Sequence, residues 1–353
     1  MRAAVLIAEG DPDEALVVRR EPVPEPNVGE VRVRVSHAAL NRLDAWIRVG
    51  RPSVDKPRIT GADGVGWIDA MGDGADALLA ARGLAIGDRV VLDPGASCGA
   101  CAACTRGETS LCRSFRVLGE HVAGTHAEFV VLPATAVHAA PGHLDDAQAA
   151  GLVLTYATAW RMLFARARVQ PDERVLVWGG SSGVGSAALQ LCASHGIETI
   201  TTTRSADKRE ALLALGAAQV VVTDGEDARA QVLEAVRTTC GPDGIEVAFD
   251  HLGQAAWEPS MAALARGGRY VTCGATTGAN PPAGITRLFW KQLAMLGSTM
   301  ASNADVAAMV EHVTRHELVP VVDRTFELDR IAEAHRRIES GDHLGKIVLR
   351  VAR

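Results

Sequence analysis

Residues 174–196 read RVLVWGGSSGVGSAALQLCASHG, and this stretch determines how the rest of the chain is interpreted. Its first seven residues have the apolar, β-branched pattern of a strand, and its last thirteen have the apolar spacing of a helix. The glycines between them differ in spacing from the commoner G-x-G-x-x-G but serve the same purpose. They allow a tight turn, a backbone close to a pyrophosphate and a helix N-terminus that faces the anion. The stretch therefore predicts a dinucleotide-binding turn, with the cofactor held by Gly180, Gly183, Val184 and Gly185.

Beyond this turn, apolar strand patterns alternate with helical patterns. We expect helices at 184–196 and 206–216, and strands at 174–180, 198–203, 219–223, 245–250 and 269–274. Continuous apolar strands separated by helices indicate a parallel sheet that is covered on both faces. This half of the chain is therefore expected to be a doubly wound α/β domain.

The first 150 residues have a different character. The segment VRVRVSHAAL (31–40) alternates apolar and polar side chains, as a half-buried strand does, and turn-forming stretches rich in Gly, Pro and Asp separate such runs. Near the C-terminus, a helix at 329–340 precedes a strand at 346–351 that we expect to return to the first domain. The sequence thus predicts an α/β protein with a β-rich domain (1–154 and 300–353) and a parallel-sheet coenzyme domain (155–299).

Composition and charge exclude several classes of protein. The 353 residues include 36 Lys and Arg against 42 Asp and Glu, a net charge of −6 that gives no reason to expect nucleic acid as a partner. No apolar run is long enough for a membrane span, and the N-terminal stretch MRAAVLIAEG is too short for a signal peptide and resembles a first strand. Seven cysteines, an odd number, argue against a disulfide framework. We therefore expect a cytoplasmic protein.

Four of the cysteines are clustered in a lobe at 95–115. They have the spacing C-x2-C-x2-C-x7-C within a polar loop that has little apolar material of its own. Four thiolates this close in a reducing compartment suit a tetrahedral structural zinc site, although an iron–sulfur cluster or four free thiols are the alternatives. The expected zinc ligands are Cys98, Cys101, Cys104 and Cys112.

The end of the second expected strand of the coenzyme domain bears on the choice of cofactor. NAD enzymes usually carry an acidic residue there, about 20 residues after the glycine turn, whereas this chain has Thr203. Arg204 and Lys208 follow, and together with Ser205 they have the donors needed to bind a 2′-phosphate. The alternative is a solvated basic loop. We favour NADPH, with NADH as the alternative.

Further motifs extend the comparison along the whole chain. They are LNRLD (40–44), GADGVG (61–66), GDRV (87–90), LTYATAW (154–160) and LGSTM (296–300). In this order, with the cysteine lobe and the glycine turn, the chain resembles the medium-chain dehydrogenase/reductase superfamily. The lobe is similar to the structural zinc site of zinc-containing alcohol dehydrogenases, whereas LNRLD and GADGVG look more like the quinone oxidoreductase branch. The resemblance implies a GroES-like catalytic domain and a Rossmann coenzyme domain.

The chain departs from zinc alcohol dehydrogenases at the positions that do their chemistry. Aligned on the motifs, the three ligands of the catalytic zinc fall at Asn41, Ala62 and Gly151. The two positions of the proton relay fall at Leu43 and Trp46. Because Ala, Gly and Leu side chains neither coordinate a cation nor relay a proton, the sequence predicts a retained structural zinc and no catalytic zinc.

Without that metal, hydrogen-bond donors would have to stabilise charge that develops on a substrate. Asn41 offers an amide NH2, or alternatively is a structural amide that caps a turn. His126 aligns with a position that lines the family's substrate pocket, or alternatively is a surface or second-layer histidine. Trp46 and Trp290 are candidates for an apolar wall beside a flat substrate. The candidate catalytic residues are therefore Asn41, His126 and Trp46.

The remaining site residues follow from the resemblance alone. It implies that the cofactor site also includes Arg42, Thr155, Gly274 and Lys346. Two acidic residues in the motifs, Asp44 and Asp63, are expected to hold the backbone and their neighbours rather than to take protons.

These expectations favour an NADPH-dependent reductase of quinones or α,β-unsaturated carbonyl compounds. An activated double bond is easier to reduce without a Lewis acid than a simple ketone is. Two alternatives remain: an alcohol dehydrogenase that binds metal through other ligands, and a non-catalytic nucleotide-binding or regulatory protein. The partners expected are a small-molecule substrate and further copies of the chain, since the resemblance implies a homodimer or a tetramer.

Overall fold

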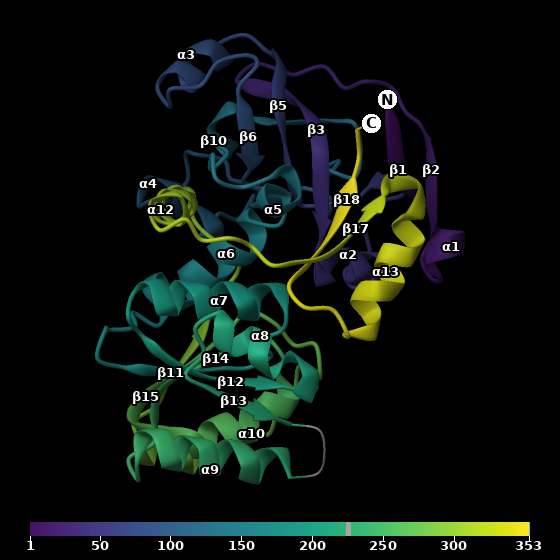
Figure 1. The fold of residues 1–353 in the computed structure, drawn as a ribbon. Helices are drawn as coiled ribbons and strands as arrows, with labels where there is room; N and C mark the ends of the chain where they lie inside the picture. The colour runs from purple at the N-terminus through teal and green to yellow at the C-terminus, as the bar shows by residue number, and fades with distance from the viewer. Residues whose placement is uncertain (224–226, 353) are drawn as a thin grey trace. The chain divides into compact units, whose positions relative to one another are not determined.

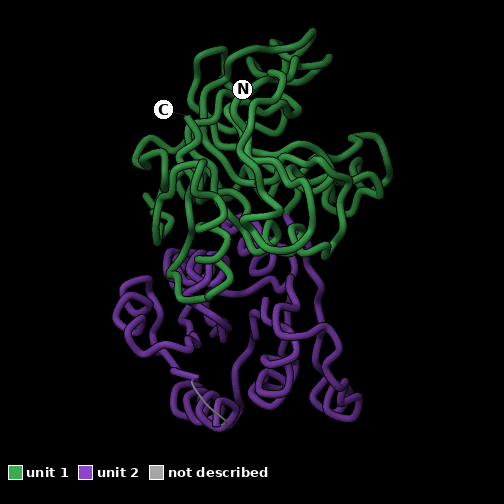
Figure 2. The backbone as a smooth tube through the Cα atoms, turned by 90° about the vertical axis from the view of Figure 1, so that its right-hand side faces the viewer, with its two compact units in different colours: residues 1–154, 301–353 green, residues 155–300 purple. Residues whose placement is uncertain are grey.

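The chain folds into two compact units. The computed structural model describes residues 1–223 and 227–352. Unit 1 comprises Met1–Leu154 and Ala301–Arg353, and unit 2 comprises Thr155–Met300 (Figure 2). Among the described residues, no helix is both long enough and apolar enough to cross a membrane.

Unit 2 is a Rossmann-type domain built on one sheet. Its six strands are all parallel and have the order β13-β12-β11-β14-β15-β16. Helices α7 and α8 cover one face of this sheet, and α9 and α10 cover the other (Figure 1). The strands are β11 (Arg174–Val177), β12 (Glu198–Thr203), β13 (Gln219–Val222), β14 (Ile245–Asp250), β15 (Leu264–Thr272) and β16 (Ala294–Gly297). The helices are α7 (Gly183–Ser194), α8 (Arg209–Ala214), α9 (Ala228–Cys240), α10 (Gln254–Ala263) and α11 (Ile285–Trp290).

The predicted alternation of strands and helices is confirmed, with three differences. The helix expected at 206–216 begins as a short 3-10 turn, Ala206–Lys208, before α8. Strand β15 starts at Leu264, five residues before the predicted start, because two glycines and two arginines hide its pattern in the sequence. Strand β16 was not predicted, because it is short and its residues alternate between half-buried and exposed at the edge of the sheet.

Unit 1 is the β-rich domain, and its strands are mostly antiparallel. A seven-stranded sheet has the order β10-β6-β5-β3-β18-β17, with β9 also paired to β3, and a smaller sheet has the order β2-β1-β4. Strands β7 and β8 pair within the cysteine lobe. The strands are β1 (Arg2–Leu6), β2 (Leu16–Arg20), β3 (Glu30–Leu40), β4 (Arg58–Ile59), β5 (Asp63–Met71), β6 (Arg89–Leu92), β7 (Gly95–Ala96), β8 (Arg116–Val117), β9 (Phe129–Pro133), β10 (Val137–Ala139), β17 (Val322–Glu327) and β18 (Lys346–Arg350).

Short helices connect these strands. In unit 1 they are α1 (Pro12–Ala15), α2 (Arg42–Arg48), α3 (Ala75–Ala80), α4 (Ala102–Thr105), α5 (Asp146–Ala150), α12 (Asn303–Arg315) and α13 (Ile331–Ser340). Helix α6 (Val153–Trp160) contains the boundary between the two units.

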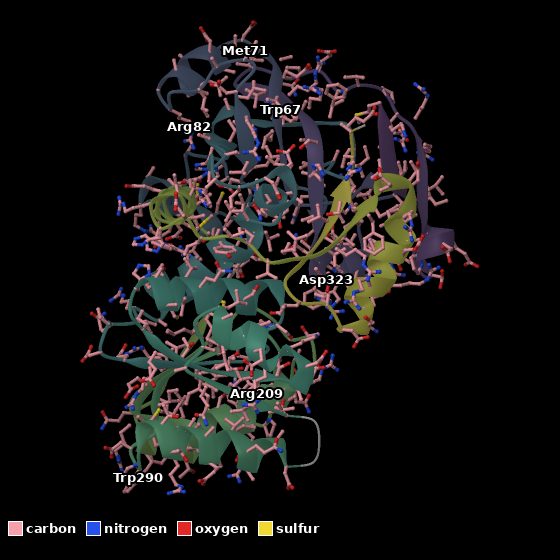
Figure 3. The ribbon with its side chains drawn as sticks, viewed as in Figure 1. Trp67, Met71, Arg82, Arg209, Trp290 and Asp323 are labelled. Carbon is pink, nitrogen blue, oxygen red and sulfur yellow. The ribbon has the colours of Figure 1, made fainter. Side chains whose placement is uncertain are left out.

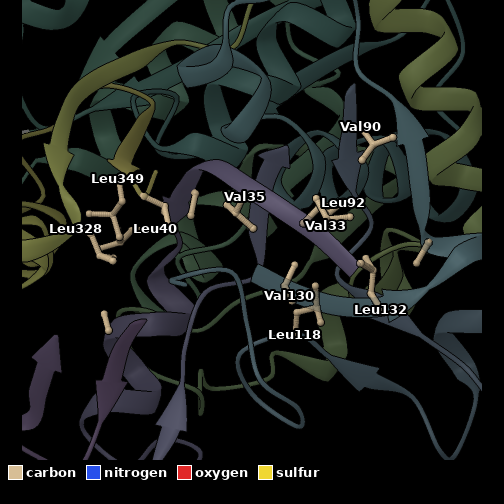
Figure 4. Close-up of a cluster of buried hydrophobic side chains, with 14 of the residues drawn as sticks. Val33, Val35, Leu40, Val90, Leu92, Leu118, Val130, Leu132, Leu328 and Leu349 are labelled. Atoms are coloured by element: carbon tan, nitrogen blue, oxygen red, sulfur yellow. The ribbon is translucent and has the colours of Figure 1, made fainter. Parts of the chain in front are cut away.

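The core of unit 1 is organised around β3. Val33 and Val35 are fully buried at alternate positions of this strand, as the sequence pattern predicts (Figure 4). Leu349 of β18 belongs to the same cluster, together with side chains of β9 and β6. The C-terminal strand therefore returns to the first domain, where it pairs antiparallel with β3, and this prediction is confirmed.

Candidate functional site

Three strand ends of unit 1 bring a small polar network together. Asn41 follows the last residue of β3, whereas Asp63 and Lys346 are the first residues of β5 and β18. Because both neighbours run antiparallel to β3, its end lies beside their beginnings: Ala39 is paired with Asp63, and Leu40 with Ile347. The sheet topology therefore brings together residues that are far apart in the sequence.

The network consists of a buried ion pair and an amide. The ammonium Nζ of Lys346 lies 2.8 Å from Oδ2 of Asp63 and donates to Oδ1 of Asn41 at 2.6 Å. Nδ2 of Asn41 donates to the same Asp63 oxygen at 3.0 Å. The other Asp63 oxygen accepts the backbone N–H of Leu154 at 2.8 Å. All three side chains are nearly excluded from solvent, with exposures of 6% for Asn41, 0% for Asp63 and 4% for Lys346.

Chemistry fixes the orientation of the Asn41 amide. An ammonium has only donors, so the amide oxygen must face Lys346, and a carboxylate has only acceptors, so the amide nitrogen must face Asp63. One N–H of Asn41 is then taken by Asp63. The other has no acceptor among the described residues of the chain. Asn41 therefore keeps one N–H that no described residue accepts, and its amide is held between Lys346 and Asp63 rather than by a side-chain cap of helix α2.

Asp44 anchors the backbone on both sides of the network. Its two carboxylate oxygens accept the backbone N–H groups of Asn41 at 2.8 Å and Gly61 at 3.0 Å. Burial raises the pKa of Asp44 to about 6, and these two hydrogen bonds oppose that rise. The geometry is that of the backbone-holding role expected from the sequence.

Of the other candidates of unit 1, His126 lies close enough to Asp63 and Lys346 for their charges to act on it. His126 is fully buried, with Nδ1 3.0 Å from Oγ1 of Thr60 and Nε2 without a partner. Burial lowers its pKa to about 3, so it is neutral near pH 7 and is poorly suited to protonate a product there. Trp46 and Arg42 are half-buried on helix α2.

The cysteine lobe gathers its four sulfurs into one cluster. All four lie within 4.8 Å of one another, at 3.5 Å for Cys112 and Cys98, 3.6 Å for Cys101 and Cys104, and 3.9 Å for Cys98 and Cys104. Zn–S bonds of about 2.3 Å in a tetrahedron place sulfurs about 3.8 Å apart, so the cluster has the dimensions that zinc requires. Among the described residues, this is the only group of three or more His, Cys, Asp and Glu side chains placed to hold a metal ion.

The glycine turn of unit 2 joins β11 to helix α7. Ser182 caps the helix, and its Oγ accepts the N–H of Gly185 at 2.9 Å. A Cβ atom on Gly185 would lie 2.3 Å from the carbonyl oxygen of Gly179, so only glycine allows this close approach. Gly180, Gly183 and Val184 complete the turn at the helix N-terminus, which is the geometry that suits a pyrophosphate.

The expected 2′-phosphate residues follow β12 but are not all free to bind. Thr203 is buried at the strand end, and Arg204 is exposed. The hydroxyl of Ser205 donates to the carboxylate of Asp207, and this hydrogen bond lowers the pKa of Asp207. Lys208 lies at the end of the same turn. Asp207 therefore adds a negative charge beside the expected phosphate position.

Sequence reasoning missed His251, which directly follows β14. Its Nε2 lies 3.0 Å from Oγ of Ser182, so it contacts the cap of the glycine turn. The signal that could have found it is positional: in a parallel sheet, residues that follow β14 and β11 emerge at the same edge. Gly274, after β15, is placed at this edge too, and its N–H lies 3.4 Å from Oγ1 of Thr272. Thr155 is buried in helix α6.

Comparison with known proteins places the chain in a family. A model described as the alcohol dehydrogenase GroES-like domain matches residues 27–142, and one described as zinc-binding dehydrogenase matches residues 183–315. A solved NAD-dependent alcohol dehydrogenase is 41% identical to this chain, with a TM-score of 0.92 over 100% of both chains. The chain belongs to the medium-chain dehydrogenase/reductase superfamily. It is therefore an NAD(P)-dependent oxidoreductase.

Two further relatives show the range of the superfamily around this chain. Crotonyl-CoA carboxylase/reductase of Cereibacter sphaeroides is 28% identical over 95% of this chain and 83% of its own length. Quinone oxidoreductase of Rattus norvegicus is 26% identical over 99% of this chain and 97% of its own length.

The positions that the superfamily resemblance assigns to a catalytic zinc do not fit one in this chain. The oxygen of Asn41 already accepts the Lys346 ammonium, and Ala62 has no ligand atom. A Cβ atom on Gly151 would lie 3.1 Å from Cγ of Lys346, so the lysine fills the space beside this position.

Trp290, which the sequence suggested as part of an apolar wall beside the substrate, is 66% exposed at the surface of unit 2 (Figure 3). Within its own unit, its side chain therefore does not line an apolar wall.

Proposed function

We propose that this oxidoreductase reduces the activated double bond of an α,β-unsaturated carbonyl compound or a quinone, without a catalytic metal. The observation that carries the proposal is the buried network of Asn41, Asp63 and Lys346, in which Asn41 stands at one of the three positions that the resemblance assigns to the ligands of a catalytic zinc. The names of two relatives, a crotonyl-CoA carboxylase/reductase and a quinone oxidoreductase, support the same substrate class.

The residues of the network suit this reaction. NAD(P)H, bound at the glycine turn of unit 2, supplies the hydride. As the carbon–carbon double bond or quinone is reduced, negative charge develops on the substrate oxygen, and in this proposal the remaining N–H of Asn41 stabilises it. The resulting enolate or hydroquinone monoanion takes its proton from solvent, so no buried acid is required. His126 is not used in this scheme.

A second candidate function is alcohol oxidation, because the 41% identical structure is called an alcohol dehydrogenase. An alcohol must lose its hydroxyl proton as hydride departs, and in zinc enzymes the metal makes that proton acidic. Leu43 and Trp46 occupy the relay positions here and have no group that would carry the proton away. Assays of NADP⁺ with primary and secondary alcohols separate the two functions.

We further propose that the cysteine lobe binds one structural zinc per chain. Metal analysis of the purified protein is expected to find one zinc, and two per chain would contradict the proposal. Cys104→Ser removes one thiolate and is expected to lower the melting temperature and the zinc content together, because metal binding holds a lobe that has little packing of its own. Cys240→Ser, which changes a cysteine of unit 2 outside the cluster, is the matched control and is expected to keep the zinc.

NADPH is the proposed cofactor, and Arg204 the residue that selects it. A charge-assisted contact with the 2′-phosphate is worth roughly 1.5–3 kcal/mol, which corresponds to about ten- to a hundredfold in affinity. Arg204→Ala is therefore expected to weaken NADPH binding by that factor and to leave NADH binding unchanged. Titration of both cofactors measures this. Asp207→Asn should strengthen NADPH binding, and equal affinity of the wild type for both cofactors would contradict the assignment.

The cellular location and the oligomeric state of the protein are further proposals. We expect a cytoplasmic enzyme that works as a homodimer or a tetramer, as the superfamily resemblance implies. Sedimentation of the purified protein measures the assembly, and a monomer at micromolar concentration would contradict it.

A further inference from the structure

We propose that Lys346 is an electrostatic positioning residue, whose ammonium replaces the charge of a catalytic metal by polarising the Asn41 amide. This inference rests on the proposed function, because it explains how that amide becomes a strong donor. It also departs from the role in cofactor binding that the superfamily resemblance implies for Lys346.

The first support is where the charge lies. The ammonium donates to the carbonyl oxygen of the Asn41 amide, 2.6 Å away. An ammonium at the oxygen of an amide draws electron density away from its nitrogen, so both N–H groups become stronger donors. In an interior of low dielectric this effect is larger than in water. The free N–H of Asn41 is therefore a stronger donor than an ordinary asparagine offers.

The second support is the balance of charge with Asp63. Alone, a buried carboxylate 3.0 Å from the Asn41 nitrogen would repel a negative charge that develops nearby. Lys346 neutralises this carboxylate at 2.8 Å while it also binds the amide. The pair thus fixes the amide from both ends and itself carries no net charge.

The third support is that the site is built around the lysine. The backbone N–H of Lys346 donates to the carbonyl oxygen of Val321 at 2.8 Å, which anchors the start of β18. A Cβ on Gly151 would lie 3.1 Å from Cγ and 3.3 Å from Cβ of Lys346, so a larger residue there would crowd the lysine. Glycine at position 151, which has no metal-ligand atom, therefore also leaves the space that the side chain of Lys346 occupies.

The fourth support is the cost of burial. Lys346 is 4% exposed and Asp63 is 0% exposed. Replacing a buried ion pair of this kind by apolar side chains of similar size often leaves the stability of a protein unchanged. Stability alone therefore gives little reason to keep a charged pair here. A role in the reaction provides a reason to keep it.

The test uses a charge-neutral double variant, Lys346→Met with Asp63→Asn, because removing only one charge of a buried pair endangers the fold. The double variant is expected to keep the melting temperature and the NADPH affinity of the wild type. Its kcat for an enone or quinone is expected to fall about 100-fold with little change in KM, the effect of weakening one transition-state donor. Lys56→Met, which removes a half-buried lysine paired with Glu9, is the matched control and should retain full activity.

The outcomes distinguish the inference from the function on which it rests. A double variant with wild-type kcat would overturn the role of Lys346 and leave the proposed function intact. Loss of NADPH affinity with unchanged kcat would also overturn it, because Lys346 would then serve the cofactor. A wild-type protein that reduces no enone or quinone would overturn both.

Discussion

Replacing Asn41 with alanine is expected to lower kcat for enone or quinone reduction by roughly 100- to 1,000-fold, the usual effect of removing one oxyanion donor. The amide is fixed by Lys346 on its oxygen and by Asp63 on its nitrogen, so its free N–H is already oriented before the substrate arrives. Such a donor acts mainly on the charge of the transition state. KM should therefore change much less than kcat.

Steady-state kinetics with NADPH and one enone measure this effect. Asn27→Ala, which removes an exposed asparagine bonded to Glu30, is the matched control and is expected to leave kcat unchanged. An Asn41→Ala variant that raises KM while kcat stays the same would show that the amide only helps to bind the substrate.

Replacing Gly185 with alanine is expected to weaken NADPH binding by about ten- to a hundredfold and to destabilise unit 2 by roughly 1–3 kcal/mol. The added methyl group would lie 2.3 Å from the carbonyl oxygen of Gly179 and 2.8 Å from Cα of Gly180. Both contacts are with backbone, so no side chain can rotate away to relieve them. The turn must open, which moves the N-terminus of α7 away from the pyrophosphate.

Thermal unfolding and cofactor titration test this prediction together. Gly297→Ala is the control in the same unit, because a Cβ there would meet nothing within 4 Å. Wild-type NADPH affinity in Gly185→Ala would mean that the cofactor does not rest on this turn.

The fold was largely predictable from the sequence because its signals are local. The strand, turn and helix of residues 174–196 identify the parallel-sheet unit, and the alternation in 31–40 identifies the central strand of the other sheet. Where a strand carries polar or small residues, as β15 and β16 do, the pattern is masked and only pairing with neighbours reveals it.

The candidate site was only partly predictable, because its contacts join distant parts of the chain. The sequence singles out Asn41 and Asp63 separately, but it gives no sign that Lys346, some 300 positions later, reaches both. His251 was missed for the same reason, since only strand order places it beside Ser182. The burial of His126 was not predictable either, because nothing in the sequence near it shows that the fold excludes its side chain from solvent.

The proposed function assigns the reaction to these residues and places no zinc at the reacting oxygen. The cysteine lobe keeps the dimensions of a metal site, whereas the former ligand positions hold an amide, a methyl group and a glycine packed against a lysine. The proposed zinc and the proposed reaction are thus assigned to different groups of residues, and a chelator should distinguish them.

The most direct test is the rate of NADPH oxidation with quinones and enals, measured beside NADP⁺ reduction with alcohols, before and after brief exposure to a chelator. We predict turnover of at least one quinone or enal at a rate that the chelator does not change, and no appreciable oxidation of alcohols. Robust alcohol oxidation that the chelator abolishes would contradict the metal-free account.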